Sequence, residues 1–129
     1  YNLPVDIYAP CAMGATINDD TLTRLKASVI AGGANNQLAE EERHGRILRS
    51  EGIIYAPDFV INAGGIINIS SELKGNYNSD LAYSWTEKIY DTTKKIFEFA
   101  DTHDLPTQQA AMKLAENRIE DIGKVKLSL

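Results

Sequence analysis

The chain has 129 residues, of which 43% are apolar and 24% charged, a balance typical of a soluble globular protein and not of a disordered one. Its 18 acidic and 13 basic residues give a net charge of −5, and the absence of a basic stripe argues against a nucleic-acid partner. No uncharged run approaches the roughly 20 residues that span a bilayer, and the first residues do not read as a secretory signal. The lone cysteine, Cys11, excludes an internal disulfide, so we expect a single-domain cytoplasmic protein.

Three short apolar runs in the first half predict strands. They lie near residues 5–9, 28–32 and 53–60, and each is bounded by proline or glycine. The connections between them are short and carry helical patterns. Strands and helices that alternate in this way predict a parallel α/β sheet with helices on its faces.

The two connections predict two helices of different character. Asp19 or Asp20 can cap a short helix that runs to Ala27. Residues 38–49 are dominated by charges, including the run at Glu40–Glu42, and predict a solvated helix with Gly52 at its C′ position.

The second half reads as helical. A helix is predicted from near Gly64, a long one over 79–101, and a last one that Thr107 caps and Gly123 ends, with a loose tail over 124–129. Apolar residues at helical spacing predict the buried sides of the last two helices. They are Leu81, Trp85, Ile89, Ile96, Phe97 and Ala100 in the first, and Ala111, Leu114, Ala115, Ile119 and Ile122 in the second.

Small and amide residues follow each predicted strand. Ala12, Asn35, Asn36 and Asn62 would line one crevice, because ligands of open α/β sheets bind outside the carboxyl ends of the strands. A side-chain amide offers both a donor and an acceptor, as a carboxamide or amino-acid ligand requires. The alternative is that these are ordinary turn residues, since Gly and Asn lead in turns. No G-x-G-x-x-G or Walker A motif is present.

Two asparagines stand in the uncharged stretch over 59–71. Each buried amide left unpaired costs roughly 1–3 kcal/mol, so Asn62 and Asn68 need partners. For Asn68 local helix capping is the favoured reading. The other reactive side chains are weaker candidates: His44 and His103 are expected at the surface, and Cys11 as a small buried residue. No metal site is predicted, because no cluster has metal-ligand spacing.

Three segments carry a resemblance to a known family. "DIYAPCAMGATIND", "VIAGGANNQL" and "GIIYAPDFVINAGGIINISSEL" resemble the glutamate/leucine/phenylalanine/valine dehydrogenase superfamily, and the leucine-acting members are nearest in pattern. The resemblance extends from Val5 to about Ile122. It implies the C-terminal half of a Rossmann-like, doubly wound parallel sheet followed by long C-terminal helices. Residues 1–75 would be a partial NAD-binding domain without the glycine-rich first βα unit, and 76–129 a helical segment packing on it.

The resemblance also implies an activity and its residues. The family catalyses NAD-dependent oxidative deamination of an L-amino acid, here a branched-chain one, to a 2-oxo acid and ammonia. The small-molecule substrate and NAD would be the ligands. By similarity, residues of this chain would line the site as follows: Cys11, Ala12, Met13, Asn35, Asn36 and Asn62 at the cofactor, and Asn36, Ile66 and Ile69 at the substrate.

The catalytic lysines of the family lie in an N-terminal domain that has no counterpart in this sequence. We therefore expect no catalytic residue here and no activity from the isolated chain. A homo-oligomer and the absence of a membrane or nucleic-acid partner are also expected. The alternative is a non-catalytic module that pairs with itself or with another subunit, because a half-sheet leaves an edge strand and apolar faces uncovered.

Overall fold

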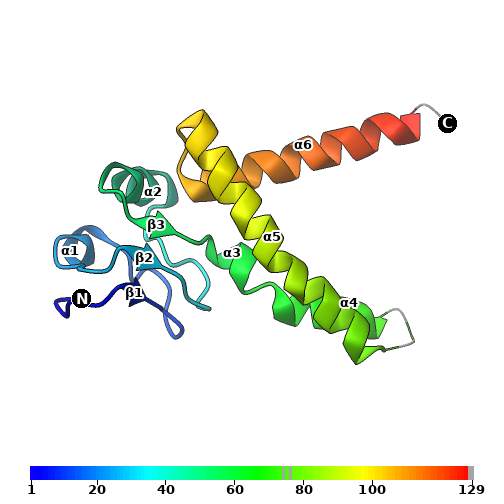
Figure 1. Cartoon of the computed structure of the whole chain (residues 1–129), viewed down its shortest axis with the longest axis horizontal. Helices are drawn as coiled ribbons and strands as arrows, with labels where there is room; N and C mark the ends of the chain where they lie inside the picture. Colours follow the sequence, from blue (N-terminus) through cyan, green and yellow to red (C-terminus); the bar gives the residue numbers. More distant parts are fainter. Residues whose placement is uncertain (74, 76, 128–129) are drawn as a thin grey trace.

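The structure is a computed structural model that describes residues 1–73, 75 and 77–127, the last three by their backbone only. Three strands precede a run of helices, and the long helices α5 and α6 follow one another in the second half (Figure 1). The elements are β1 (Ile7–Tyr8), α1 (Asp19–Leu22), β2 (Val29–Ile30), α2 (Glu41–Ser50), β3 (Ile54–Tyr55), α3 (Asp58–Ile61), α4 (Gly64–Leu73), α5 (Ser79–His103) and α6 (Thr107–Leu127).

The strands form a parallel sheet in the order β1-β2-β3, which confirms the α/β prediction. Tyr8, Ile30 and Tyr55 pair across the sheet and share one face, where Ile30 and Tyr55 are buried. The other face is open at both edges of the sheet, where Ile7 is 58% and Ile54 49% exposed. Only one side of the sheet therefore has a complete core.

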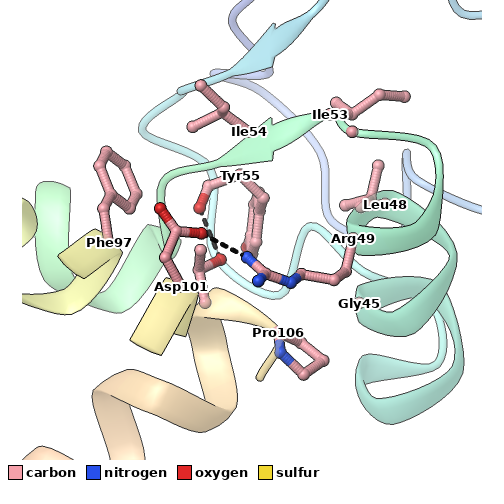
Figure 2. A pocket seen from close by; sticks show the side chains of 11 residues that line it. Gly45, Leu48, Arg49, Ile53, Ile54, Tyr55, Phe97, Asp101 and Pro106 are labelled. Atoms are coloured by element: carbon pink, nitrogen blue, oxygen red, sulfur yellow. Dashed lines mark hydrogen bonds and ion pairs between the residues drawn. The ribbon is translucent and has the colours of Figure 1, made fainter. Parts of the chain in front are cut away.

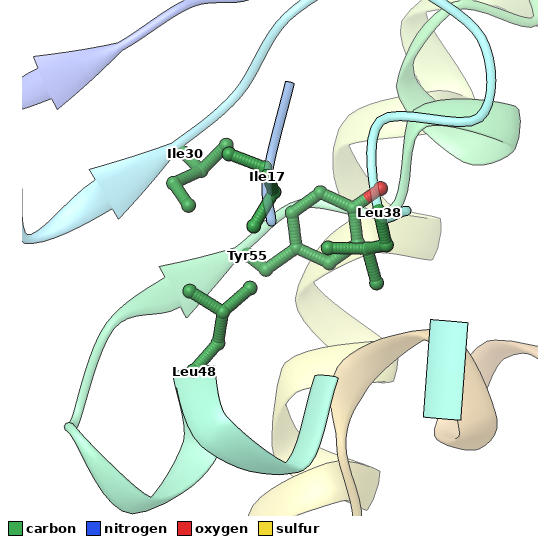
Figure 3. Close-up of a cluster of buried hydrophobic side chains, with 5 residues drawn as sticks. All are labelled: Ile17, Ile30, Leu38, Leu48 and Tyr55. Carbon is green, nitrogen blue, oxygen red and sulfur yellow. The ribbon is translucent and has the colours of Figure 1, made fainter. Parts of the chain in front are cut away.

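That core is a cluster of five side chains between the sheet and α2 (Figure 3). Burying a leucine or isoleucine side chain contributes about 1.5–3 kcal/mol, so this cluster is the main source of stability in the first half. Its members come from the strands, from α2 and from a lone parallel bridge between the two connections: Ile17, Ile30, Leu38, Leu48 and Tyr55.

A second cluster forms where α5 turns into α6. Ile96, Ala100, Ala110 and Ala111 are its buried residues, and the three alanines let the two helices approach closely. Asp104 ends α5 in the left-handed conformation, with φ of 52°. The helices diverge from this corner, and α6 runs away from the sheet (Figure 1).

Of the predicted ends of the first two helices, both ends of the first are wrong and the C′ position of the second is confirmed. Asn18, not Asp19 or Asp20, caps α1, because its side chain accepts from the backbone N–H groups of Asp20 and Thr21. The short helix stops at Leu22 and does not reach Ala27. Gly52 takes the predicted C′ position of α2, with φ of 69°.

Two larger errors concern the third strand and the last helix. Residues 58–60, predicted as strand, belong to α3, because Pro57 leaves the sheet and opens a helical turn. The last helix continues through Gly123 to Leu127, so most of the predicted loose tail is helical, and residues 128–129 lie outside the described part. Thr107, predicted as the cap of this helix, is its first residue instead, and its hydroxyl donates to the carbonyl of Tyr55 at 2.6 Å.

The predicted buried sides hold near the corner of α5 and α6 and fail away from it. Ile96, Ala100 and Ala111 are buried. Where α4 packs against the first part of α5 (Figure 1), Ala82 is buried and Leu81 is 42% exposed. Ile119 is 70% and Ile122 50% exposed, because no described element covers that end of α6. Within the described residues, no helix has the length and hydropathy needed to cross a membrane.

Candidate ligand site at the carboxyl ends of the strands

The loops that follow β1 and β2 lie against each other. The backbone N–H of Ala34 donates to the carbonyl of Pro10 at 3.0 Å, and that of Gly33 donates to Cys11 Sγ at 3.4 Å. A Cβ on Gly32 would overlap Pro10, so only glycine allows this approach. Two of the three predicted strand-end segments are thus side by side.

The third segment joins them through Asn62. Asn62 ends α3, and its Nδ2 donates to Asn35 Oδ1 at 2.5 Å and to the carbonyl of Gly33 at 3.3 Å. The structure therefore brings together two residues that are 27 positions apart in the chain.

This amide pair keeps free hydrogen-bonding groups. The Nδ2 protons of Asn62 have two protein acceptors, whereas Asn62 Oδ1 and Asn35 Nδ2 have no protein partner among the described residues. One acceptor and one donor group are therefore presented together at an exposed position. A ligand carboxamide, which also carries one donor group and one acceptor, is complementary to such a pair.

Asn36 lies beside the pair in a strained conformation. Its φ of 53° is left-handed, which asparagine tolerates better than most residues, and its carbonyl accepts from Ala15 N at 2.7 Å. The side chain is exposed and borders a polar cavity of about 270 Å³. The cavity is lined by Asn35, Asn36, Gln37, Leu38, Glu41, Tyr55, Asp58 and Phe59.

The remaining predicted site residues are exposed. Cys11, Ala12 and Met13 lie on the surface of the loop after β1, where Met13 is 71% exposed. The expectation that Cys11 is buried is wrong, because this loop lies at the surface above Gly33. Ile66 and Ile69 lie on α4, 70% and 55% exposed, and α4 packs against α5.

Asn68 has local partners, but they are side chains and not the backbone that we expected. Its Nδ2 donates to Glu72 Oε1 at 2.8 Å, one turn further along α4. The hydroxyl of Tyr77 donates to its Oδ1 at 3.0 Å. The amide is therefore satisfied without a ligand.

His44 is buried, so the expectation of a surface histidine is wrong. Only 1% of it is exposed, and both of its ring nitrogens face protein atoms. Its Nδ1 accepts from the backbone N–H of Glu40 at 2.8 Å, and its Nε2 lies 3.3 Å from Asp19 Oδ1. Potential metal ligands of Asp19, Glu40 and His44 all lie within 4.8 Å of one another. Spacing gave no hint of this cluster, because Asp19 and His44 are 25 positions apart.

The chemistry of this cluster argues against a metal ion. A neutral imidazole whose Nδ1 accepts a hydrogen bond carries its proton on Nε2, the atom that faces the cluster. Arg43 already neutralises the carboxylates, at 2.8 Å from Asp19 and 3.1 Å from Glu40. Loss of water around Asp19 raises its pKa, whereas the hydrogen bonds from His44 and Arg43 lower it. Together the hydrogen bonds have the larger effect, so the pKa of Asp19 lies below its usual value. The cluster therefore ties α1 to α2.

The sequence did not identify three residues of the site: Gln37, Tyr55 and Asp58. Gln37 is fully buried, and its Nε2 donates to the carbonyls of Gly32 and Ala34 at 2.6 and 2.9 Å. Asp58 is 7% exposed, and its carboxylate accepts from Gln37 N and Phe59 N. Burial and the Asp58 charge raise the pKa of Tyr55 well above its usual value. The only available signal was a carboxylate directly after Pro57, where a helix begins.

A second cavity, of about 390 Å³, lies away from these residues between β3, α2 and the α5–α6 corner (Figure 2). Its lining is mainly apolar, and Arg49 crosses it to reach Asp101 Oδ1 at 2.6 Å. The hydrogen bond that Arg49 donates to Asp101 raises the pKa of Arg49, so this guanidinium already has a partner within the chain. The cavity contains none of the predicted site residues.

Comparison with known proteins gives the context of this geometry. The sequence profile of the Glutamate/Leucine/Phenylalanine/Valine dehydrogenase family matches residues 1–126. A leucine dehydrogenase of Thermoactinomyces intermedius is 53% identical over 126 residues, which are 98% of this chain and 34% of that protein. An L-tryptophan dehydrogenase of Nostoc punctiforme is 48% identical over 98% of this chain and 35% of that protein.

A crystal structure of L-tryptophan dehydrogenase from Nostoc punctiforme superimposes with a TM-score of 0.92, at 48% identity, and covers 96% of this chain and 37% of that one. The chain thus spans about a third of the length of the relatives it matches. It belongs to the Glutamate/Leucine/Phenylalanine/Valine dehydrogenase family.

Proposed function

We propose that this member of the amino-acid dehydrogenase family forms one wall of an NAD and amino-acid site, as part of an NAD-dependent enzyme that oxidatively deaminates a branched-chain L-amino acid. The observation that carries the proposal is the Asn35–Asn62 pair, which presents one free acceptor and one free donor group at the carboxyl ends of the strands. The nicotinamide carboxamide has the complementary groups. Bound NAD would supply the hydride acceptor, and the side chains of this chain would orient it.

The other residues take roles that fit their exposure. The small, exposed loop over Cys11, Ala12 and Met13 would let the ribose and nicotinamide approach the backbone. Asn36, in its left-handed conformation beside the pair, would contact both cofactor and substrate. Residues 1–75 would be the cofactor-binding part and 76–129 the helical segment packing on it.

The choice of a branched-chain substrate rests on α4. Ile66 and Ile69 expose apolar side chains on one side of this helix, which suits an aliphatic substrate. The relatives named for leucine and for tryptophan are 53% and 48% identical to this chain, so identity alone discriminates weakly between these substrates. One methylene in such a pocket changes preference by only about 1–3 kcal/mol.

The proposal is tested by binding and turnover. NAD⁺ titrated into the ¹⁵N-labelled chain should shift the side-chain amide signals of Asn35 and Asn62, with leucine producing no turnover. Lysines that match the family's catalytic ones are absent from this sequence, so one wall alone is expected to be inactive. Turnover by the 129-residue chain, or NAD⁺ binding that leaves both asparagines unaffected, would contradict the proposal. Cytoplasmic location and a homo-oligomeric state stay predictions.

A second candidate function is a non-catalytic pairing module. The open face of the sheet favours it, because Ile7 and Ile54 are half exposed at its edges. Light scattering distinguishes the two: a stable assembly without NAD⁺ binding supports the module, and NAD⁺ binding supports the enzyme.

A further inference from the structure

The loop that carries Asn35 and the helix that carries Asn62 are joined twice. One connection is the exposed amide pair, at the end of α3. The other is buried, at the beginning of α3, where Gln37 N donates to Asp58 Oδ2 at 3.3 Å. Because α3 has only four residues, a contact at each end fixes both its position and its direction relative to the loop.

Gln37 holds its own loop from within. Its side chain is fully buried, and its two Nε2 protons are both used, by the carbonyls of Gly32 and Ala34. Its carbonyl accepts from Ile17 N at 2.9 Å, which fixes the loop to the connection after β1. The loop that presents Asn35 is thereby closed around one glutamine side chain.

Asp58 holds α3 in the same way. Its Oδ1 accepts from Phe59 N at 2.9 Å, and its own backbone N–H lies 3.4 Å from the hydroxyl of Tyr55. A buried carboxylate is unfavourable unless it is hydrogen-bonded, and here both of its oxygens accept from backbone N–H groups. Only one of these donors belongs to its own helix, so the carboxylate is a fixed point between two segments.

We propose that Gln37 and Asp58 are positioning residues, a buried bridge that sets the distance between Asn35 and Asn62 and so presents the amide pair to its ligand. This inference extends the proposed function, and its measurement of NAD⁺ binding rests on that function. Its effect on the amide pair itself does not depend on that function.

The test uses the complete ¹⁵N-labelled chain and three variants. Gln37→Leu removes the donors to Gly32 and Ala34, and Asp58→Asn replaces one carboxylate acceptor by a donor. Gln108→Leu is the matched control, because Gln108 is equally buried and also donates its Nε2 to a backbone carbonyl, but at the α2–α6 contact. Two quantities are measured: the side-chain amide signals of Asn35 and Asn62, and the dissociation constant for NAD⁺.

Gln37→Leu and Asp58→Asn are expected to shift or broaden both amide signals and to weaken NAD⁺ binding by about tenfold, which corresponds to about 1.4 kcal/mol. Gln108→Leu should leave signals and affinity unchanged at equal folded fraction. Unchanged amide signals in both bridge variants, or an equal shift in the control, would overturn the inference.

The outcomes for the bridge and for the proposed function are separable. If the unmodified chain binds no NAD⁺, the proposed function fails, and the amide signals alone decide whether the bridge positions the pair. If Gln37→Leu does not fold, Asp58→Asn decides. If neither variant folds, the positioning role is overturned, because the bridge then serves stability alone.

Discussion

Gly45 on α2 faces the side-chain amide of Gln108 on α6 so closely that a Cβ on Gly45 would overlap it. Gln108 is 2% exposed, and its Nε2 donates to the carbonyl of Glu41 at 2.8 Å. This contact joins the helical half of the chain to the half that carries the sheet. The glycine is what allows α6 to reach the backbone of α2.

Gly45→Ala should therefore destabilise the chain. Overpacking a buried contact costs about 1–3 kcal/mol, whereas alanine returns about 1 kcal/mol of helix propensity, so the net loss in urea unfolding should be up to about 2 kcal/mol. Gly123→Ala, within α6 and with no neighbouring atom within 4 Å, is the control and should be neutral or stabilising. Adding Gln108→Ala should relieve the loss. Equal stability of the two alanine variants would contradict the overlap.

The parallel sheet was predictable because its signals are local. Ile7, Ile30 and Tyr55 lie in apolar runs that proline or glycine ends within a few residues. The same locality made the small residues and asparagines after the strands visible as site candidates. The direct contact between Asn35 and Asn62 then followed from the geometry of a parallel sheet, whose strands end at one edge.

Burial that depends on distant partners was not predictable. His44 is buried beside Asp19, 25 positions away, and Asp58 is a fixed point because Gln37, 21 positions away, donates to it. Ile119 and Ile122 show the opposite error, because they were predicted to be buried and are exposed. Helical spacing identifies the apolar side of a helix but not whether another element covers it.

Acid should weaken the contact between α1 and α2. The pKa of Asp19 is lowered in the folded chain, so its contribution is present above the usual value of 3.8 and is lost as pH falls through the lowered pKa. Thermal midpoints should therefore fall more steeply in the unmodified chain than in Asp19→Asn once the pH drops below 3.8. The other carboxylates are present in both proteins. Parallel plots of thermal midpoint against pH would therefore mean that Asp19 contributes nothing.

The two histidines should be opposite neutral tautomers. His44 Nδ1 accepts from Glu40 N, which leaves the proton on Nε2, whereas His103 Nδ1 lies 2.9 Å from the carbonyl of Phe99 and must donate. Long-range ¹H–¹⁵N spectra of the rings distinguish these forms at neutral pH. Adding Zn²⁺ should leave the His44 signals in place. A proton on His44 Nδ1, or a shift of the His44 signals on adding Zn²⁺, would contradict the argument against a metal site.

Alkaline pH should destabilise the chain through Tyr55. Burial and the Asp58 charge raise the pKa of this phenol, so the stability it contributes is present below the usual value of 10.0 and is lost as the pH rises toward the raised pKa. Tyr55→Phe should start less stable, because Asp58 N loses its contact with the hydroxyl, but should depend less on pH above 10.0. Unfolding followed by circular dichroism at a series of pH values measures both the initial stability and its dependence on pH. Tyr90→Phe, at a position 74% exposed, should retain the alkaline transition.

Asp104→Gly should stabilise the corner between α5 and α6. Asp104 has φ of 52°, a conformation that costs a residue with a Cβ roughly 1 kcal/mol and that glycine adopts freely. The substitution also removes the ion pair with Arg49 at 3.4 Å, but that pair is exposed on the aspartate side and is worth at most about 0–1 kcal/mol. Arg49 also keeps its shorter contact with Asp101. The expected net effect is a higher free energy of unfolding by a few tenths of a kcal/mol to about 1 kcal/mol. Asp104→Ala, which loses the ion pair and keeps the strain, is the matched control. A glycine variant that is no more stable than the alanine variant would show that the left-handed turn carries no strain.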